Sequence, residues 1–525
     1  MTKVLIADSL DPRAKEVFDN RGVEVDVKVG LSEEELIACI GAYDGLAVRS
    51  ATKVTAKVLA AADRLKVVGR AGIGVDNIDV PASTAKGVVV MNTPFGNAIT
   101  TAEHAIAMMF ALAREIPQAD ASTQAGKWEK SRFMGVELTG KTLGIIGCGN
   151  IGSIVADRAI GLRMKAIAFD PFLTDERAIE IGVEKVDLDT LLKRADIITL
   201  HTPLTDKTRG IIDAAAIAKT KKGVRIVNCA RGGLVDEKAL KEALDSGHVA
   251  GAALDVFEVE PAKENPLFGH PNLVCTPHLG ASTTEAQVNV AIQIAEQIAD
   301  YLLSGAVINA LNMPSVTAEE APRLAPYMKL ATQLGSFAGQ MTQSAIQSVV
   351  IEYEGHAASL NCKPLTAAAL CGLLSPQLEN VNMVSAPVVA SQRGIDVSEV
   401  RHDRDSDYQT LVRLTVTTEN QTRSIAGTLF GGDKPRVVNV KGVPMEAELG
   451  PHMLYVTNDD KPGLIGRLGT VLGEAGVNIA TFHLGRDRVG GDAIALVEID
   501  GEIPADVMAK VAALPNVVQA RVLAF

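Results

Sequence analysis

Short apolar runs alternate with amphipathic segments along the first 310 or so residues. Runs such as KVLIAD, VVVMN and TLGII are rich in β-branched residues, and each leads into a segment with helical spacing. This alternation is typical of parallel sheets covered by helices. A longer helix is expected over residues 98–115, then a polar stretch (QADASTQAGKWEKSRF) and a second βα series from Lys141. We therefore predict two doubly wound, Rossmann-like α/β units.

The pattern changes after a Pro-containing connector, NALNMPSV at residues 309–316. Residues 317–450 combine an amphipathic helix over residues 326–341 with strands such as SVVIEYEG, TLVRLTVTT and RVVNVKG, which predicts a separate α+β domain. From about Met453 the pattern reads β-α-β-β-α-β. Such a unit forms a four-stranded antiparallel sheet with two helices on one face.

Composition narrows the class of protein. A chain of 525 residues has room for about three to four domains. With 51 Lys and Arg against 63 Asp and Glu, its formal charge of −12 opposes binding to nucleic-acid backbones. The longest apolar stretch, residues 105–113, is about half of a membrane span, and the start MTKVLIADSL lacks the features of a signal peptide. We predict a cytoplasmic protein with no nucleic-acid or membrane partner.

The six cysteines are scattered without CxxC or Cys/His ligand spacing. We therefore expect reduced thiols and no metal site.

The sharpest local motif is GCGNIG at residues 147–152, between the apolar run TLGII and a helical pattern. In that context Gly147 permits a tight turn, Gly149 lets the backbone approach a pyrophosphate, and Gly152 allows close helix packing. The helix N-terminus supplies N–H groups for the phosphates. Asp170 ends the next strand, where it can bind both ribose hydroxyls and repel a 2′-phosphate. The motif predicts NAD as the cofactor.

Three downstream blocks end apolar runs and carry candidate catalytic residues. They are NCARGG from Asn228, DVFEVEP from Asp255 and TPHLGA from Thr276. Ligands of doubly wound sheets bind at the carboxyl ends of strands, so these blocks can meet at one site. A histidine can take the proton of a secondary alcohol, a carboxylate can fix its tautomer, and an arginine can hold a substrate carboxylate.

These blocks, with HTPLT from His201 and ALDVFEVEP from Ala253, resemble the D-2-hydroxyacid dehydrogenase family, and the resemblance runs through the whole chain. It implies that Arg231, Glu260 and His278 are catalytic. The resemblance, together with the GCGNIG motif, gives the following expected NAD contacts: Gly147, Gly149, Asn150, Ile151, Gly152, Asp170, Thr202, Cys229, Ala230, Arg231, Asp255, His278, Gly280 and Ala281.

The family's domain plan implies a discontinuous first domain. The expected divisions are a substrate-binding domain of residues 1–96 and 284–312, an NAD-binding domain of residues 97–283, an intervening domain of residues 317–450 and a regulatory domain of residues 452–525. The inserted NAD-binding domain explains why the first unit carries no phosphate fingerprint of its own.

The first unit supplies candidates for substrate recognition. VRS ends one predicted strand and GRAGIG ends another. The resemblance implies 3-phosphoglycerate as the substrate. Arg49 and Ser50 suit its phosphate, and the glycine-rich turn at Gly72 and Ile73 suits its carboxylate, with Arg231 and His278 completing the set. Lys130, in KWEKSR, aligns with a family segment that lends a basic residue to a neighbouring subunit, although a solvated charge cluster fits it equally.

The C-terminal βαββαβ unit resembles an ACT domain, which in this family binds an amino acid, typically L-serine. Asn458, Asp460 and Asn478 are the candidate effector contacts, and ordinary turn roles compete for all three.

The resemblance implies NAD-dependent oxidation of D-3-phosphoglycerate to 3-phosphohydroxypyruvate, the first step of L-serine biosynthesis, by a homo-oligomer, expected to be a tetramer. Two alternatives stay open. One is another 2-hydroxyacid or 2-oxoacid substrate for the same chemistry. The other is an NAD-sensing regulatory module that keeps the fold but not the activity.

Overall fold

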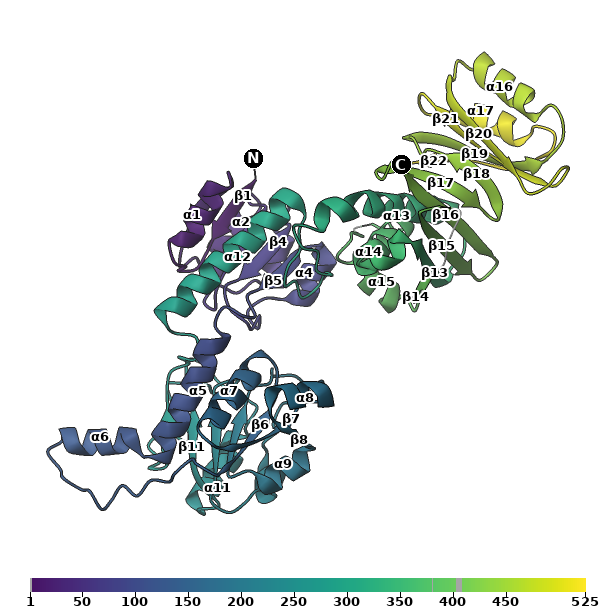
Figure 1. Cartoon of the computed structure of the whole chain (residues 1–525). Helices are drawn as coiled ribbons and strands as arrows, with labels where there is room; N and C mark the ends of the chain where they lie inside the picture. The colour runs from purple at the N-terminus through teal and green to yellow at the C-terminus, as the bar shows by residue number, and fades with distance from the viewer. Residues whose placement is uncertain (1, 380, 403–407) are drawn as a thin grey trace.

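The computed structural model describes residues 2–379, 381–402 and 408–525. Figure 1 shows an elongated molecule with four sheets, in which the second α/β unit lies at one end and the C-terminal unit at the other. In the described ranges, no helix is long and apolar enough to cross a membrane.

The first α/β unit is a five-stranded parallel sheet with strand order β2-β1-β3-β4-β5. Buried apolar side chains lie on both of its faces, as a doubly wound sheet requires. The elements are β1 (Lys3–Ile6), α1 (Arg13–Asn20), β2 (Glu24–Val27), α2 (Glu33–Ile40), β3 (Gly45–Val48), α3 (Ala56–Ala60), β4 (Val67–Arg70), α4 (Val80–Lys86) and β5 (Val89–Asn92).

Helix α12 (Thr284–Ser304) completes this unit after the chain returns from the second one. A Cβ on Gly69 of β4 would lie 2.6 Å from Ile298 and 2.7 Å from Ile294 of α12. The helix therefore packs directly on the sheet backbone, and the first unit is built from two separate stretches of chain.

The second unit is a seven-stranded parallel sheet with strand order β12-β11-β10-β9-β6-β7-β8, again with apolar cores on both faces. Its elements are α5 (Ala98–Ala113), β6 (Thr142–Ile146), α7 (Asn150–Gly161), β7 (Lys165–Phe169), α8 (Asp175–Ile181), β8 (Glu184–Lys185), α9 (Leu188–Arg194), β9 (Ile197–Leu200), α10 (Ala214–Ala218), β10 (Val224–Asn228), α11 (Glu237–Asp245), β11 (Val249–Leu254) and β12 (Leu273–Cys275).

The polar stretch after α5 is not simply a connector. It contains α6 (Ile116–Gln124), a helix with no buried residue that projects away from the sheet in Figure 1. No apolar stripe marks this segment, so periodicity gave no sign of the helix.

The third unit has a six-stranded mixed sheet in which only β13 and β14 are parallel. Helices α13 and α14 pack side by side, because backbone of one approaches Gly335 and Gly339 of the other closely. The elements are α13 (Ala321–Met341), β13 (Ile346–Gly355), η1 (His356–Ser359), α14 (Cys362–Leu374), α15 (Ala386–Gln392), β14 (Asp396–His402), β15 (Thr410–Thr418), β16 (Thr422–Phe430), β17 (Lys434–Val440) and β18 (Val443–Ala447).

The fourth unit follows the predicted βαββαβ order, and its antiparallel sheet runs β20-β21-β19-β22. The Phe337 ring of α13 meets the Tyr455 ring of β19 edge-on at 5.6 Å, and both belong to one apolar core. The last two units are therefore packed together. The elements are β19 (His452–Asp459), α16 (Leu464–Glu474), β20 (Ile479–Arg486), β21 (Asp492–Ile499), α17 (Ala505–Ala512) and β22 (Val517–Ala524).

This architecture confirms the predicted fold class: two parallel-sheet α/β units, an α+β unit and a βαββαβ unit.

Candidate active site

The glycine-rich turn between β6 and α7 has an open cradle at its centre. Gly147 has φ of +90°, a backbone conformation that favours glycine. A Cβ on Gly152 would lie 2.1 Å from the carbonyl oxygen of Gly147, so α7 sits tightly on the strand. A Cβ on Gly149 would meet nothing within 4 Å. The tight contacts at Gly147 and Gly152 are with the protein's own backbone. The open space beside Gly149 fits a dinucleotide pyrophosphate at the N-terminus of α7.

Asp170 is held beside this turn. Its Oδ2 accepts a hydrogen bond from the Cys148 backbone N–H at 2.8 Å, and its Oδ1 accepts one from Phe172 N–H at 2.8 Å. The carboxylate therefore follows the end of β7 directly, next to the cradle. That is where an adenosine ribose lies in dinucleotide-binding sheets, and the negative charge favours NAD over NADP.

His278 and Glu260 form the closest imidazole–carboxylate pair of the site. His278 Nδ1 lies 2.6 Å from Glu260 Oε2. This hydrogen bond raises the pKa of His278 above its ordinary value, although burial acts in the opposite direction. Burial alone would raise the pKa of Glu260, but the bond to His278 outweighs it and leaves the pKa of Glu260 lowered. Glu260 is therefore ionised and stabilises the imidazolium form of its partner.

The turn that carries His278 is built around a fully buried carboxylate, Asp255. His278 itself has φ of +57°. Its backbone N–H donates to the carbonyl oxygen of Asp255 at 2.9 Å, and the N–H groups of Leu279 and Gly280 donate to the Asp255 carboxylate at 2.7 and 2.8 Å. These bonds fix the backbone on both sides of the histidine.

Arg231 reaches from the second unit to the first. Its Nε donates to Asp76 Oδ2 at 3.1 Å. A Cβ on Gly74 would lie 1.7 Å from the Arg231 guanidinium, so a larger residue at position 74 would displace that side chain. The side chain of Asn228 holds the Arg231 loop by bonding to the carbonyl of Arg231 and the N–H of Ala230. The guanidinium consequently lies where the two α/β units meet.

The first unit contributes further cations at the carboxyl ends of β3 and β4. The backbone N–H of Arg49 donates to the buried Asp8 carboxylate at 2.6 Å, which fixes the loop, while Ser50 is exposed. Arg70, which the sequence interpretation left out, is half-buried near Arg231, and burial lowers its pKa to about 10. Its place at the end of a strand, in the same block as Gly72, is the signal that could have identified it.

Gly72 and Ile73 are part of this loop, but their backbone groups are already engaged. Gly72 has φ of +148° and its N–H donates to Thr93 Oγ1 at 2.8 Å, while the carbonyl of Ile73 accepts from Asn92. To bind the substrate carboxylate, the Gly72 N–H would have to release Thr93 Oγ1. Alternatively, the backbone N–H of Ile73 would donate to the carboxylate.

The other expected NAD contacts lie on loops at the carboxyl edge of the seven-stranded sheet or at the start of α7. These are Asn150, Ile151, Thr202, Cys229, Ala230, Gly280 and Ala281. Cys229 is almost completely buried, and burial raises the pKa of its thiol, which makes it a packing residue rather than a nucleophile.

The three expected effector residues divide into two places within one chain. Asp460 follows β19, where it accepts hydrogen bonds from Arg486 at 2.9 Å and from Gly490 N–H at 3.0 Å, and the neighbouring Asn458 is 4% exposed. Asn478 precedes β20 and donates to Asp500 at 2.6 Å. Asp459 pairs with Asp492 and Ile479 with Ile499, so these sites lie seven residues apart along β21. That separation is about 24 Å.

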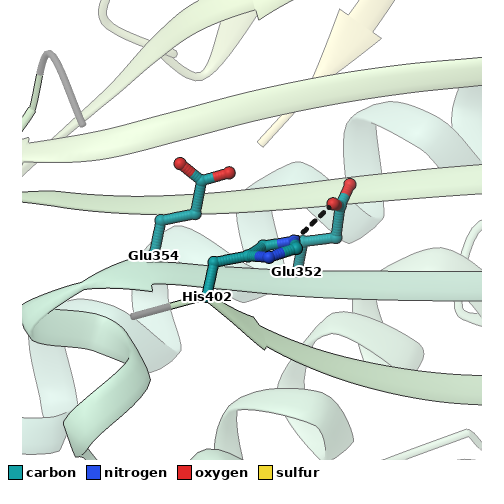
Figure 2. A group of neighbouring side chains, drawn as sticks. All are labelled: Glu352, Glu354 and His402. Atoms are coloured by element: carbon teal, nitrogen blue, oxygen red, sulfur yellow. Dashed lines mark hydrogen bonds and ion pairs between the residues drawn. The ribbon is translucent and has the colours of Figure 1, made fainter. Parts of the chain in front are cut away.

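A separate group of charged side chains lies on the six-stranded sheet (Figure 2). The side chains are Glu352, Glu354 and His402, and their ligand atoms lie within 4.8 Å of one another. His402 Nε2 lies 3.0 Å from Glu352 Oε1, and Arg413 Nε lies 3.6 Å from Glu352 Oε2. Arg413 and His402 thus give Glu352 cationic and hydrogen-bonding partners from the protein itself, and we assign no ligand to this group.

The chemistry of the site defines a class. An imidazole backed by an ionised carboxylate can take a hydroxyl proton, and a dinucleotide cradle on the same sheet edge places a hydride acceptor in reach. Such a site belongs to an NAD-dependent dehydrogenase that acts on a hydroxy acid.

Comparison with known families matches three segments of the chain. Residues 106–280 match the D-isomer specific 2-hydroxyacid dehydrogenase NAD binding domain, residues 323–441 the D-3-phosphoglycerate dehydrogenase intervening domain, and residues 452–516 the ACT domain. The first match contains the cradle, Arg231, Glu260 and His278.

Curated relatives match almost the whole chain. D-3-phosphoglycerate dehydrogenase of Synechocystis sp. is 45% identical over 97% of this chain and 92% of its own. The Bacillus subtilis enzyme of the same name is 43% identical over 100% and 99%. The chain belongs to the D-3-phosphoglycerate dehydrogenase family.

Solved structures resemble the two α/β units. A glyoxylate reductase from Paecilomyes thermophila gives a TM-score of 0.56 at 31% identity, covering 59% of this chain and 98% of its own. The TT0316 protein of Thermus thermophilus gives 0.55 at 33% identity, covering 59% and 100%.

Proposed function

We propose that this protein oxidises D-3-phosphoglycerate to 3-phosphohydroxypyruvate with NAD, as the first step of L-serine biosynthesis. The observation that carries the proposal is the 2.6 Å bond between His278 and Glu260, on the same edge of the seven-stranded sheet as the dinucleotide cradle. NAD, when bound, accepts the hydride from the substrate carbon. The choice of D-3-phosphoglycerate as the substrate rests on the names of the curated relatives.

His278 takes the hydroxyl proton in this mechanism. Since Nδ1 is bonded to Glu260, Nε2 is the nitrogen that receives the proton, and the charge that then develops on the ring is stabilised by Glu260. Arg231 holds the substrate carboxylate and polarises the developing carbonyl, exchanging its contact with Asp76 for the substrate. In the reverse direction the same imidazolium returns the proton.

Arg49 and Ser50 hold the phosphate at the other end of the substrate. A dianion is best met by a guanidinium and a hydroxyl donor, and Arg49 stands on a loop fixed by Asp8 and Asn77. Gly72, Ile73, Arg231 and His278 surround the carboxylate end. The remaining NAD contacts follow the assignment made from the family resemblance.

The domain boundaries proposed from the sequence accompany this mechanism. The substrate-binding domain is residues 1–96 with 284–312, the NAD-binding domain residues 97–283, the intervening domain residues 317–450 and the ACT domain residues 452–525. The return of α12 onto β4 supports a discontinuous first domain.

An amino acid, L-serine, is the proposed effector of the ACT domain. The separation of Asn478 from Asn458 and Asp460 within one chain favours a site shared by two ACT domains paired side by side, in which each copy supplies one end. Serine should lower the turnover of the native protein, and Asn478→Ala should relieve that inhibition while leaving uninhibited turnover unchanged.

The proposed assembly is a homotetramer. Its support is the arm after α5, where large apolar side chains face solvent in a single chain: Ile116 is 51% exposed, Trp128 87% and Met134 79%. Lys130 lies on the same arm and is exposed, as a residue reaching a neighbouring subunit would be. Light scattering measures the assembly, and emission from Trp128, the single tryptophan, reports whether the arm becomes buried.

We also place the protein in the cytoplasm. All six cysteines are free thiols in the structure, as expected for a reducing compartment. Cell fractionation tests this placement.

The test of the proposed function is NADH formation from NAD and D-3-phosphoglycerate. The native protein should turn over this substrate, and His278→Ala should lose about 10²–10⁴-fold in kcat because the proton acceptor is gone. His270→Ala, a histidine elsewhere on the NAD-binding unit, is the matched control. Absence of turnover by the native protein with this substrate would contradict the proposal.

A further inference from the structure

His104 contacts the carboxylate around which the His278 turn is built. His104 lies on α5, and its Nε2 is 3.2 Å from Asp255 Oδ1 and 3.3 Å from Thr276 Oγ1. Thr276 Oγ1 in turn donates to Asp255 Oδ1 at 2.5 Å. Asp255 is 0% exposed, so each of its donors matters to the free energy of keeping that charge buried.

The same network lies at the crossing between the two α/β units. The chain enters the second unit through the start of α5 and leaves it through residues 280–283. The hydroxyls of Thr100 and Thr283 lie 3.4 Å apart across these two connections. A Cβ on Gly280 would lie 3.2 Å from the Asp255 carboxylate and 3.4 Å from Thr101 of α5. The two connections are therefore packed against each other and against Asp255.

We infer that His104 is a positioning residue, which couples the interdomain connection on α5 to the placement of His278 through Asp255 and Thr276. It touches neither substrate nor cofactor in this inference. The argument rests on the proposed function, because it takes His278 as the proton acceptor.

The physical basis is the number of donors on one buried carboxylate. Thr276, Leu279 and Gly280 belong to the turn itself, so they move with it. His104 is the donor that comes from a different element, α5. Without it the turn keeps its internal bonds and its packing against α5, but the Asp255 carboxylate loses its hydrogen bond from that helix. The distance between His278 and Glu260 is then held less firmly from outside the loop.

The decisive variants are His104→Leu and His104→Gln. Leucine removes the donor, so His278 should be displaced. A displacement of about 1 Å should lower kcat roughly 10- to 100-fold and leave KM for D-3-phosphoglycerate near the native value. A looser bond to Glu260 lowers the pKa of His278, so the rising limb of oxidation rate against pH should move to lower pH. The glutamine amide restores a donor, and His104→Gln should recover most of kcat and the native limb.

Three further variants separate positioning from general damage. Glu103→Gln changes the exposed neighbour on the same helix and should behave as native. Thr276→Val removes the hydroxyl and should reproduce the shifted limb, whereas Thr276→Ser should not. The double variant His104→Leu/Thr276→Val should lose less than the two single losses combined, since both act on one network.

The outcomes separate cleanly. Native kcat and a native pH limb in His104→Leu overturn the inference, as does an equal loss in His104→Leu and His104→Gln without any movement of the limb. If His104→Leu does not fold, the Thr276→Val and Thr276→Ser pair decides by the same pH limb. Full turnover in His278→Ala, measured alongside, would instead mean that the proposed function has failed.

Discussion

The five-stranded and seven-stranded sheets are both parallel and both covered by helices on two faces, but the loops at their carboxyl ends carry different chemistry. The first unit presents Arg49 and Arg70 and carries no GxGxxG dinucleotide motif in its sequence. The second presents the open turn at Gly149 and the His278–Glu260 pair. In the proposed mechanism, one architecture thus provides an anion-holding half and a hydride- and proton-transferring half. The residues at the strand ends, and not the sheet itself, therefore decide what each half does.

Glu260→Gln should cause the largest loss of kcat, because it removes a charge from the seven-stranded unit and leaves the five-stranded unit unchanged. We expect kcat to fall by about 10²–10⁴-fold, since the imidazolium loses its carboxylate. Glu260 raises the pKa of His278, so its removal lowers that pKa and the rising limb of oxidation rate moves to lower pH. Initial rates across a pH series measure both effects.

The control for this variant is Glu258→Gln, an exposed carboxylate on the same loop. If the rising limb of oxidation rate against pH stayed at the native pH in Glu260→Gln, the protonation of His278 would not govern that limb.

Asp170→Ser should have the next largest effect and should act on the cofactor alone. Losing the charged hydrogen bonds to ribose costs about 1.5–3 kcal/mol, or roughly 10- to 100-fold in kcat/KM for NAD. Removal of the negative charge should also raise the relative efficiency with NADP. Rates with both cofactors measure the ratio, and Asp175→Ser, an exposed acid on α8, is the control. An unchanged NAD/NADP ratio would contradict the role given to Asp170.

Substitutions of the two cradle glycines should have the smallest effect on proton transfer. One should change the stability of the fold, and the other should change the binding of NAD. Gly152→Ala places a Cβ 2.1 Å from backbone and should cost about 1–3 kcal/mol of unfolding free energy. Gly149→Ala meets open space, so it should leave the melting temperature near native but weaken NAD binding. Thermal melts with and without NAD separate the two. If NAD raised the melting temperature of Gly149→Ala as much as that of the native protein, the space at Gly149 would not be reserved for the cofactor.

Much of the site was predictable because its residues are local to their motifs. The glycines and Asp170 follow from a fixed spacing around one turn, and strand ends brought Arg231, Glu260 and His278 to one edge of a parallel sheet. Arg70, Asp76 and His104 were not predicted, since their roles arise from contacts between distant segments. Helix α6 was not predicted because it has no buried face. The separation of about 24 Å between the effector residues depends on strand register, which no local pattern encodes.

The division of roles between the two sheets can be measured as one ratio. It is kcat/KM for D-3-phosphoglycerate divided by kcat/KM for unphosphorylated D-glycerate, in the native protein and in Arg49→Gln. Loss of the guanidinium contact should lower kcat/KM for the phosphorylated substrate by roughly 10- to 100-fold and leave D-glycerate nearly unaffected. The ratio should therefore fall by roughly the same factor in Arg49→Gln. A ratio that stays at the native value, with or without an equal loss for both substrates, would mean that Arg49 does not hold the phosphate.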